Sequence, residues 1–226
     1  MLTQIYGITT AADAALVNAL APDHVGVVLD EGIATWDRVD LGTLGEIVAE
    51  LRDVAVVALS LSKARERILR TVEQVRPAWL HLARAADGLT PDSVASLRAE
   101  VAPVRLMLTI PVRDAGATDL ARRFAPRVDA LLLDTAHPKT GAVGATGLVH
   151  DWSLSRRIVE AVEAPVILAG GLGPENVVEA IRRVGPAGVD SETRTSREDD
   201  RRRKDPERVR SFLERARAAR PAPRAI

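Results

Sequence analysis

The chain has 226 residues, of which 46% are hydrophobic and 27% are charged, a balance typical of a globular protein that buries a full core. Its formal net charge is zero, which excludes a global field that would attract nucleic acid or an anionic membrane. It contains no cysteine, which excludes disulfides, thiolate metal sites and cysteine nucleophiles.

The first residues do not combine a basic segment with an apolar one, so we expect no signal peptide. No apolar run approaches the ~20 residues needed to span a bilayer. The four histidines lack the spacing of metal ligands, and no dinucleotide-binding glycine motif follows the first apolar segment. We therefore expect a cytoplasmic protein without a metal or cofactor, and without a nucleic-acid or membrane partner.

Short apolar segments alternate with amphipathic segments along the chain, which predicts strands alternating with helices. The expected strands cover Leu2–Tyr6, Val25–Leu29, Val54–Leu61, Trp79–Leu82, Val104–Ile110, Ala130–Asp134, Val166–Ala169 and Gly188–Ser191. The expected helices cover Thr10–Leu20, Leu41–Leu51, Ala64–Val75, Asp92–Glu100, Asp119–Phe124, Leu154–Val162, Pro174–Val184 and Pro206–Ala218. We find no domain linker in this series.

Eight strand–helix units predict an α/β fold in which a parallel sheet closes into a single-domain (β/α)8 TIM barrel. An open doubly wound sheet is the alternative. We expect the barrel to cover residues 1–220 and residues 221–226 to form a disordered tail. The charge-rich run Thr195–Lys204 predicts a solvated, mobile loop after the eighth strand.

In such barrels the loops that follow the strands build the active site, so the residues at the strand ends are the functional candidates. Asp134 ends an apolar strand, where it is either a functional acid or an N-cap or ion-pair partner. His81 is either a polar pocket residue or a satisfied core histidine. Arg38 is either an anion clamp or a solvated surface charge.

The segment from Leu168 to Val177 joins a strand end to an expected helix through Gly170 and Gly171. Glycines let a backbone approach a ligand closely, and the N–H groups of a helix N-terminus favour an anion. The segment therefore indicates a phosphate site, or else a tight turn that needs small residues.

Taken together, these segments resemble the phosphoribosylanthranilate isomerase family over nearly the whole chain, from Ile5 to about Phe212. The family's Lys-Ile-Cys-Gly-Ile-Thr, Gln-Leu-His-Gly, Leu-Leu-Leu-Asp and Gly-Gly-Thr-Gly correspond to residues 4–9, 79–82, 131–134 and 144–147. Its Asp-Trp, Leu-Ala-Gly-Gly-Leu-x-Pro-Glu-Asn-Val and Lys-Asp correspond to residues 151–152, 168–177 and 204–205.

The resemblance implies an Amadori rearrangement, in which an aspartate acid opens a ribose ring to a Schiff base and a cysteine base removes the C2 proton. It implies that Asp134 is the acid, that Arg38 lies near a substrate carboxylate, and that Gly170 and Gly171 offer N–H groups to a phosphate. The implied partner is a small phosphosugar-like substrate, and the protein is expected to be a monomer or a homodimer.

Two departures from the family lie in the expected pocket. Tyr6 occupies the position of the cysteine base, and a phenol with a pKa of ~10 is a poor base at neutral pH. After strand eight, the family's Asp-x-x-Ser-Gly becomes Asp190-x-x-Thr193-Arg194, so that arginine replaces the phosphate-binding glycine. Arg194 either binds phosphate by its own charge or blocks the backbone cradle. Gln4 also replaces a lysine.

Three functional hypotheses follow. The first is an isomerase of an N-glycosidic phosphosugar, with Asp134 as acid and Tyr6, His81 or Asp190 as the relocated base, and with Thr193 and Arg194 completing the phosphate site. The second is a diverged paralogue that acts on a different small molecule in specialised metabolism. The third is a non-catalytic barrel.

Overall fold

The computed structural model describes residues 1–29, 32, 35–62, 64–83, 88–136 and 148–219. Its strands are β1 (Leu2–Ile5), β2 (His24–Leu29), β3 (Arg38–Val39), β4 (Ala55–Ser60), β5 (Trp79–Leu82), β6 (Arg105–Val112), β7 (Ala130–Thr135), β8 (Val166–Leu168) and β9 (Gly188–Ser191). Its α-helices are α1 (Ala11–Ala19), α2 (Leu41–Glu50), α3 (Arg65–Val75), α4 (Pro91–Val101), α5 (Gly116–Phe124), α6 (Trp152–Ala161), α7 (Val177–Val184) and α8 (Pro206–Ala218). Two short 3-10 helices are η1 (Ala125–Arg127) and η2 (Thr193–Thr195).

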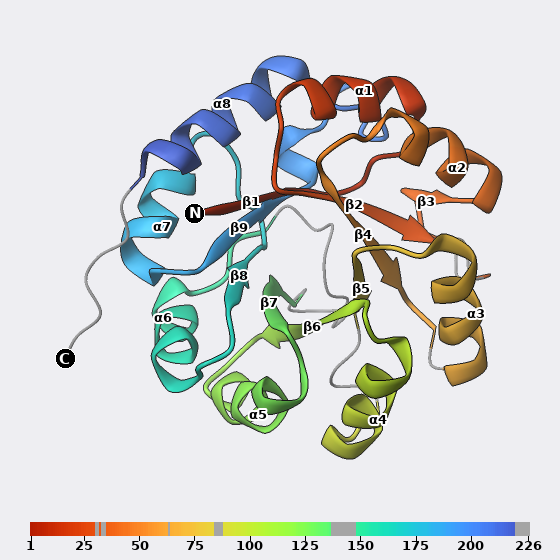
Figure 1. Ribbon diagram of the computed structural model, residues 1–226. Helices are drawn as coiled ribbons and strands as arrows, with labels where there is room; N and C mark the ends of the chain where they lie inside the picture. The colour runs from red at the N-terminus through yellow and green to blue at the C-terminus, as the bar shows by residue number, and fades with distance from the viewer. Residues whose placement is uncertain (30–31, 33–34, 63, 84–87, 137–147, 220–226) are drawn as a thin grey trace.

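The strands form one parallel sheet in the order β1-β9-β8-β7-β6-β5-β4-β2-β3, and a further pairing of β1 with β2 closes it into a barrel. Figure 1 shows the helices arranged as a ring around these strands. The expected (β/α)8 barrel is confirmed. β3 was not expected: Arg38, which lies outside the expected strands, pairs with Val28 of β2 in this two-residue strand.

Side chains from alternating strand positions form two separate cores. Ile5, Val27 and Leu133 belong to the larger cluster, which joins the sheet to the helices. The smaller cluster fills the inside of the barrel and contains Tyr6, Val28, Val57, Trp79, Met107, Ala130, Leu132, Ile167 and Ala169. Because successive strand residues point to opposite faces, β1 turns Gln4 and Tyr6 inward and Ile5 outward. The polar residues at the strand ends therefore lie above the packed side chains of the smaller cluster.

Capping residues fix the starts of α1 and α8. Thr10 caps α1 by accepting a hydrogen bond from the N–H of Asp13, and Pro206 lies in the first turn of α8. The expectation for α7 is wrong by three residues, because the helix begins at Val177 and Pro174 lies in a turn before it. Figure 1 shows α7 and α8 side by side on the outside of β1 and β9.

The expected solvated loop over residues 195–204 is wrong at both of its ends. Thr195, Ser196 and Lys204 are buried, and Ser196 pairs with Lys204 in an isolated antiparallel bridge. The Lys204 ammonium donates to the backbone oxygen of Glu192 at 3.1 Å and to Ser196 Oγ at 3.0 Å. The charged side chains between these ends are mostly exposed, so the run is a surface loop anchored by a buried lysine.

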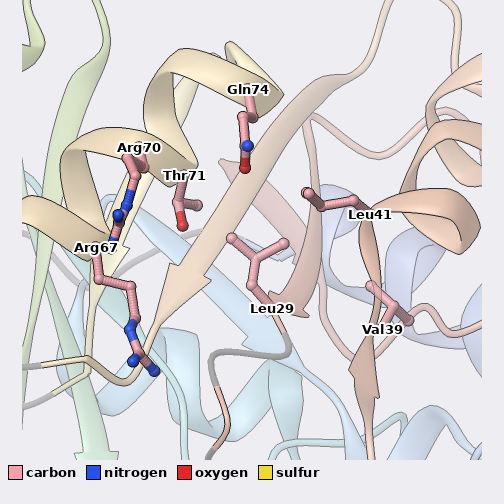
Figure 2. A pocket seen from close by; sticks show the side chains of 7 residues that line it. All are labelled: Leu29, Val39, Leu41, Arg67, Arg70, Thr71 and Gln74. Atoms are coloured by element: carbon pink, nitrogen blue, oxygen red, sulfur yellow. The ribbon is translucent and has the colours of Figure 1, made fainter.

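α2 and α3 follow each other in the ring of helices and make few contacts with each other. A groove of about 260 Å³ lies there, lined by Leu29, Val39, Leu41, Arg67, Arg70, Thr71 and Gln74. Figure 2 shows Arg67, Arg70 and Gln74 on α3 along one side of the groove and Leu41 on the other. Because Leu29 belongs to the outer core, this groove lies on the outer wall of the barrel and not at its mouth.

Within the described residues, no helix has the length and apolar character needed to cross a membrane. The expected disordered tail lies at 221–226, outside the described residues.

Candidate active site

Asp134 is a half-buried carboxylic acid near the C-terminal end of β7, where it pairs with Pro111 of β6. Burial raises the pKa of this carboxyl group to about 6, although a hydrogen bond from the N–H of Thr135, 2.7 Å from Oδ1, opposes the shift. Asp134 caps no helix and forms no ion pair within the described residues. A partly buried carboxyl group at a strand end with a raised pKa is a candidate for an acid.

Asp190 lies on β9, two strands from Asp134, and ends a polar chain through the barrel interior. Gln4 Nε2 donates to Asp190 Oδ1 at 3.2 Å, and Gln4 Oε1 lies 3.0 Å from His24 Nδ1. Burial and the negative charge of Asp134 raise the pKa of Asp190 to about 8. The structure therefore brings Asp134 and Asp190 within electrostatic reach of each other. A pKa of about 8 leaves Asp190 largely protonated at neutral pH, although the hydrogen bond from Gln4 and the charge of Lys204 oppose the shift.

Tyr6 and His81 are also brought together, across the inside of the barrel. Tyr6 Oη lies 2.7 Å from His81 Nδ1, and His81 Nε2 lies 2.6 Å from Thr109 Oγ1. All three side chains are buried. Burial and the nearby carboxylates, first that of Asp190, raise the pKa of Tyr6 well above 10, whereas burial lowers the pKa of His81 to about 3. The pair is a neutral phenol hydrogen-bonded to a neutral imidazole.

Gly26 of β2 makes room for the ring of Tyr6. A Cβ atom at this position would lie 2.5 Å from three ring atoms of Tyr6, which is closer than real carbon atoms approach. This contact was not predicted, although a glycine inside an apolar strand is a signal of close approach. Tyr6 and Gly26 are thus a complementary pair.

Glu192 follows β9 and lies beside two charged residues that we did not expect in the site, Asp37 and Lys204. Burial, followed by the charge and hydrogen bond of Asp37, raises the pKa of Glu192 well above its ordinary value. Burial also lowers the pKa of Lys204 to about 8, against the attraction of Glu192 and other carboxylates. The sequence offered two signals for Lys204: it is one of only three lysines in an arginine-rich chain, and it matches the family's Lys-Asp.

The expected phosphate residues lie on two adjoining loops. Gly170 and Gly171 both have positive φ angles, of 82° and 60°, and a Cβ atom on Gly170 would overlap Thr135 Oγ1. Asn176 accepts a hydrogen bond from the N–H of Gly173 and donates one to the backbone oxygen of Gly171. The positive φ angles of the turn therefore require glycines, and Asn176 satisfies part of the backbone hydrogen bonding of the turn.

Thr193 and Arg194 form part of η2, next to this turn. Arg194 makes an ion pair with Glu175, and its Cβ would lie 2.8 Å from a Cβ atom built on Gly173. The structure therefore places the arginine beside the glycine turn. Arg38 is half-buried on β3, beside the end of β2.

Asp190 predicts a specific dependence of stability on pH. Its pKa is about 8 in the folded protein and near 4 when the chain is unfolded, so its contribution to stability declines as the pH rises from about 4 to about 8. Asp190→Asn keeps an acceptor for Gln4 and cannot ionise. We expect the free energy of unfolding of the variant, relative to that of the wild type, to be larger at pH 8 than at pH 4.5, so that the variant is relatively more stable at pH 8.

Urea denaturation at the two pH values measures this difference. Asp199→Asn is the matched control, because it removes the same charge from an exposed position. An equal effect of Asp190→Asn on the free energy of unfolding at both pH values would contradict the raised pKa of Asp190.

Comparisons with known proteins give a consistent result. The family model described as N-(5'phosphoribosyl)anthranilate (PRA) isomerase matches residues 46–215. The chain is 36% identical to N-(5'-phosphoribosyl)anthranilate isomerase of Methanocella arvoryzae over 95% of this chain and 97% of that protein. It is 38% identical to the enzyme of the same name from Haloferax volcanii over 97% of this chain and 94% of that protein.

Among solved structures, the phosphoribosyl anthranilate isomerase of Thermus thermophilus superposes with a TM-score of 0.79 at 24% identity, over 96% of this chain and 99% of that one. This likeness concerns the fold. The segment that the family model matches begins within α2 and so does not include Tyr6 or Gly26.

Proposed function

Because the chain belongs to the N-(5'-phosphoribosyl)anthranilate isomerase family, we propose that its barrel mouth converts phosphoribosylanthranilate, an N-glycosidic phosphosugar, into the corresponding aminoketose. This is an aldose–ketose isomerisation that belongs to tryptophan biosynthesis. Identities of 36% and 38% over nearly the full length support this activity more than a diverged paralogue or a non-catalytic barrel.

Asp134 carries the proposal. A carboxyl group whose pKa is about 6 holds a proton at near-neutral pH more often than an ordinary aspartate does. We assign it the protonation of the ribose ring oxygen, which opens the ring and leaves a Schiff base between C1 and the anthranilate nitrogen. Loss of the C2 proton then gives an enolamine, which tautomerises to the ketone.

Turnover of phosphoribosylanthranilate by the purified chain tests the function. The wild type is expected to convert it, and Asp134→Asn sets the background. Wild-type turnover no greater than that background would overturn the proposal.

The remaining expected residues take supporting roles in this proposal. Arg38 is assigned to the anthranilate carboxylate, and Gly170, Gly171, Thr193 and Arg194 to the phosphate. His81 is hydrogen-bonded to Tyr6, and Asp190 is hydrogen-bonded to Gln4. These contacts support a role for His81 and Asp190 beneath the substrate, where they shape the floor of the pocket. Tyr6 contributes its ring to this floor, because its hydroxyl group faces His81 inside the barrel.

Arg194→Ala tests the phosphate assignment. A phosphate bound near η2 would gain a charge-assisted hydrogen bond from Arg194, so we expect KM for the phosphosugar to rise about tenfold with little change in kcat. Arg122→Ala is the control, because Arg122 is an exposed arginine that pairs with Asp119 on α5. A lower KM in Arg194→Ala would instead mean that this side chain obstructs the phosphate.

We place this activity in the cytoplasm, with a small phosphosugar as the partner and no nucleic acid. The protein is proposed to be a monomer or a homodimer, and size-exclusion chromatography with light scattering distinguishes the two.

A further inference from the structure

The proposed isomerisation needs a base for the C2 proton, and the residues inside the barrel are poorly suited to that task. The chain has no cysteine. The phenol of Tyr6 is buried against His81, and both ring nitrogens of His81 already have hydrogen-bond partners. Asp190 accepts a hydrogen bond from Gln4 deeper in the barrel. The base is therefore to be sought at the mouth itself.

Glu192 stands at the mouth beside the end of β1. It follows β9 directly, and its charge acts on the phenol of Tyr6 inside the barrel. The N–H of Tyr6 donates to the backbone oxygen of Ser191 at 3.0 Å, which sets Glu192 alongside Tyr6. Tyr6 occupies the position at which the resemblance puts the cysteine base, so Glu192 brings a carboxyl group next to that position.

Gly7 leaves the space that the Glu192 carboxyl group uses. A Cβ atom on Gly7 would lie 2.8 Å from Glu192 Oε1 and 3.0 Å from its Cγ. Oε1 is buried and, within the described part of the chain, accepts no hydrogen bond. A buried acceptor without a donor costs free energy, and such a group is often kept for its chemistry.

Three charged groups surround this carboxyl group: Asp37 after β2, Asp190 below it and the Lys204 ammonium beside it. The negative charge of Asp37, and that of Asp190 when it is ionised, disfavours the ionised form of Glu192 and so makes its carboxylate a stronger base. Lys204 attracts the negative charge of Glu192 and so stabilises the ionised form of its carboxyl group.

We propose that Glu192 is the catalytic base of this isomerase, and this inference rests on the proposed function. A carboxylate oxygen of Glu192 takes the C2 proton of the protonated Schiff base. The C2–H electron pair forms the C1=C2 bond, and the former C1=N π pair moves to nitrogen, which neutralises the iminium. The enolamine then gains a proton at C1 and loses its C2 hydroxyl proton, so the isomerisation consumes no co-reactant.

Glu192→Gln tests the proposal, because the amide keeps the shape of the side chain and cannot accept the proton. We expect kcat to fall by about 10²- to 10⁴-fold, as for loss of a general base, while KM changes by no more than a few fold. Glu198→Gln is the matched control, since Glu198 lies on the same loop and its side chain is 82% exposed. Thermal melting is expected to show that Glu192→Gln is at least as stable as the wild type.

Glu192→Asp and substrate carrying deuterium at C2 separate catalysis from packing. The shorter carboxylate is expected to restore part of kcat and to show a larger primary isotope effect than the wild type, because proton transfer becomes limiting. Wild-type kcat in Glu192→Gln, or an unchanged isotope effect in Glu192→Asp, would overturn the assignment of Glu192. An inactive wild type would instead overturn the proposed function, and the base assignment with it.

Discussion

Replacing Asp134 by asparagine is expected to lower kcat for phosphoribosylanthranilate by about 10²- to 10⁴-fold, the usual contribution of a positioned general acid. The amide keeps the size of the side chain but has no acidic proton for the ring oxygen. KM is expected to change little, because the proton matters mainly in the transition state. Steady-state kinetics of the two proteins measure the effect.

The pKa of Asp134 gives this prediction a second, independent readout. At pH 7 a carboxyl group with a pKa near 4 is protonated in about one molecule in a thousand, whereas one with a pKa near 6 is protonated in about one in ten. Since the acid must carry its proton, kcat/KM is expected to decline as the pH rises above about 6.

Asp119→Asn is the matched control for Asp134→Asn, because its carboxyl group lies exposed on α5 and pairs only with Arg122 among the described contacts. Similar rates in Asp134→Asn and the wild type would remove Asp134 from the mechanism. A comparable loss in Asp119→Asn would point to a general effect of charge removal.

The sequence predicted the barrel because its signals are local. Parallel strands covered on both faces appear as short apolar runs, and Val54–Leu61 and Ala130–Asp134 needed no knowledge of their neighbours. Asp134 could be found in the same way, as a carboxylate that interrupts such a run. Strand ends and candidate acids can therefore be predicted from short segments of the sequence.

The environment of Glu192 could not be predicted, because it depends on residues far apart in the chain. Lys204 lies within a run of charges that normally indicates a solvated loop, and only its contacts with Glu192 and Ser196 reveal that it is buried. Asp37 comes from the opposite end of the sequence. Charge patterns describe the composition of a segment, whereas burial depends on which segments the fold brings together.

The contact between Tyr6 and Gly26 could not be predicted either, because the two residues meet only once β1 and β2 pair in the sheet. Both residues precede the segment that the family model matches. We infer that the ring of Tyr6 is accommodated inside the barrel because the neighbouring strand has no side chain at Gly26.

Gly26→Ala is therefore expected to destabilise the protein by about 2–3 kcal/mol, as overpacking a tightly filled core does. Its Cβ atom would lie 2.5 Å from the rigid ring of Tyr6, and the hydrogen bond from Tyr6 to His81 keeps that ring from moving away freely. The free energy of unfolding in urea measures the loss.

Gly45→Ala is the matched control for this substitution, because a Cβ atom on Gly45 in α2 would meet nothing within 4 Å. Replacing a helical glycine by alanine is expected to stabilise the protein by about 0.5–1 kcal/mol. The two substitutions make the same chemical change and should act in opposite directions, since only one of them meets a side chain.

A double-mutant cycle identifies Tyr6 as the cause. Tyr6→Ala alone removes a buried ring and is expected to cost about 3–5 kcal/mol, the range for deleting a large aromatic side chain from a core. In that background Gly26→Ala has no ring to overlap, so its cost should largely vanish, and the two changes should couple by about 2 kcal/mol or more. If Gly26→Ala lowers the free energy of unfolding equally with and without the Tyr6 ring, the strain lies in β2 itself. The absence of a side chain at Gly26 would then not be what accommodates the tyrosine.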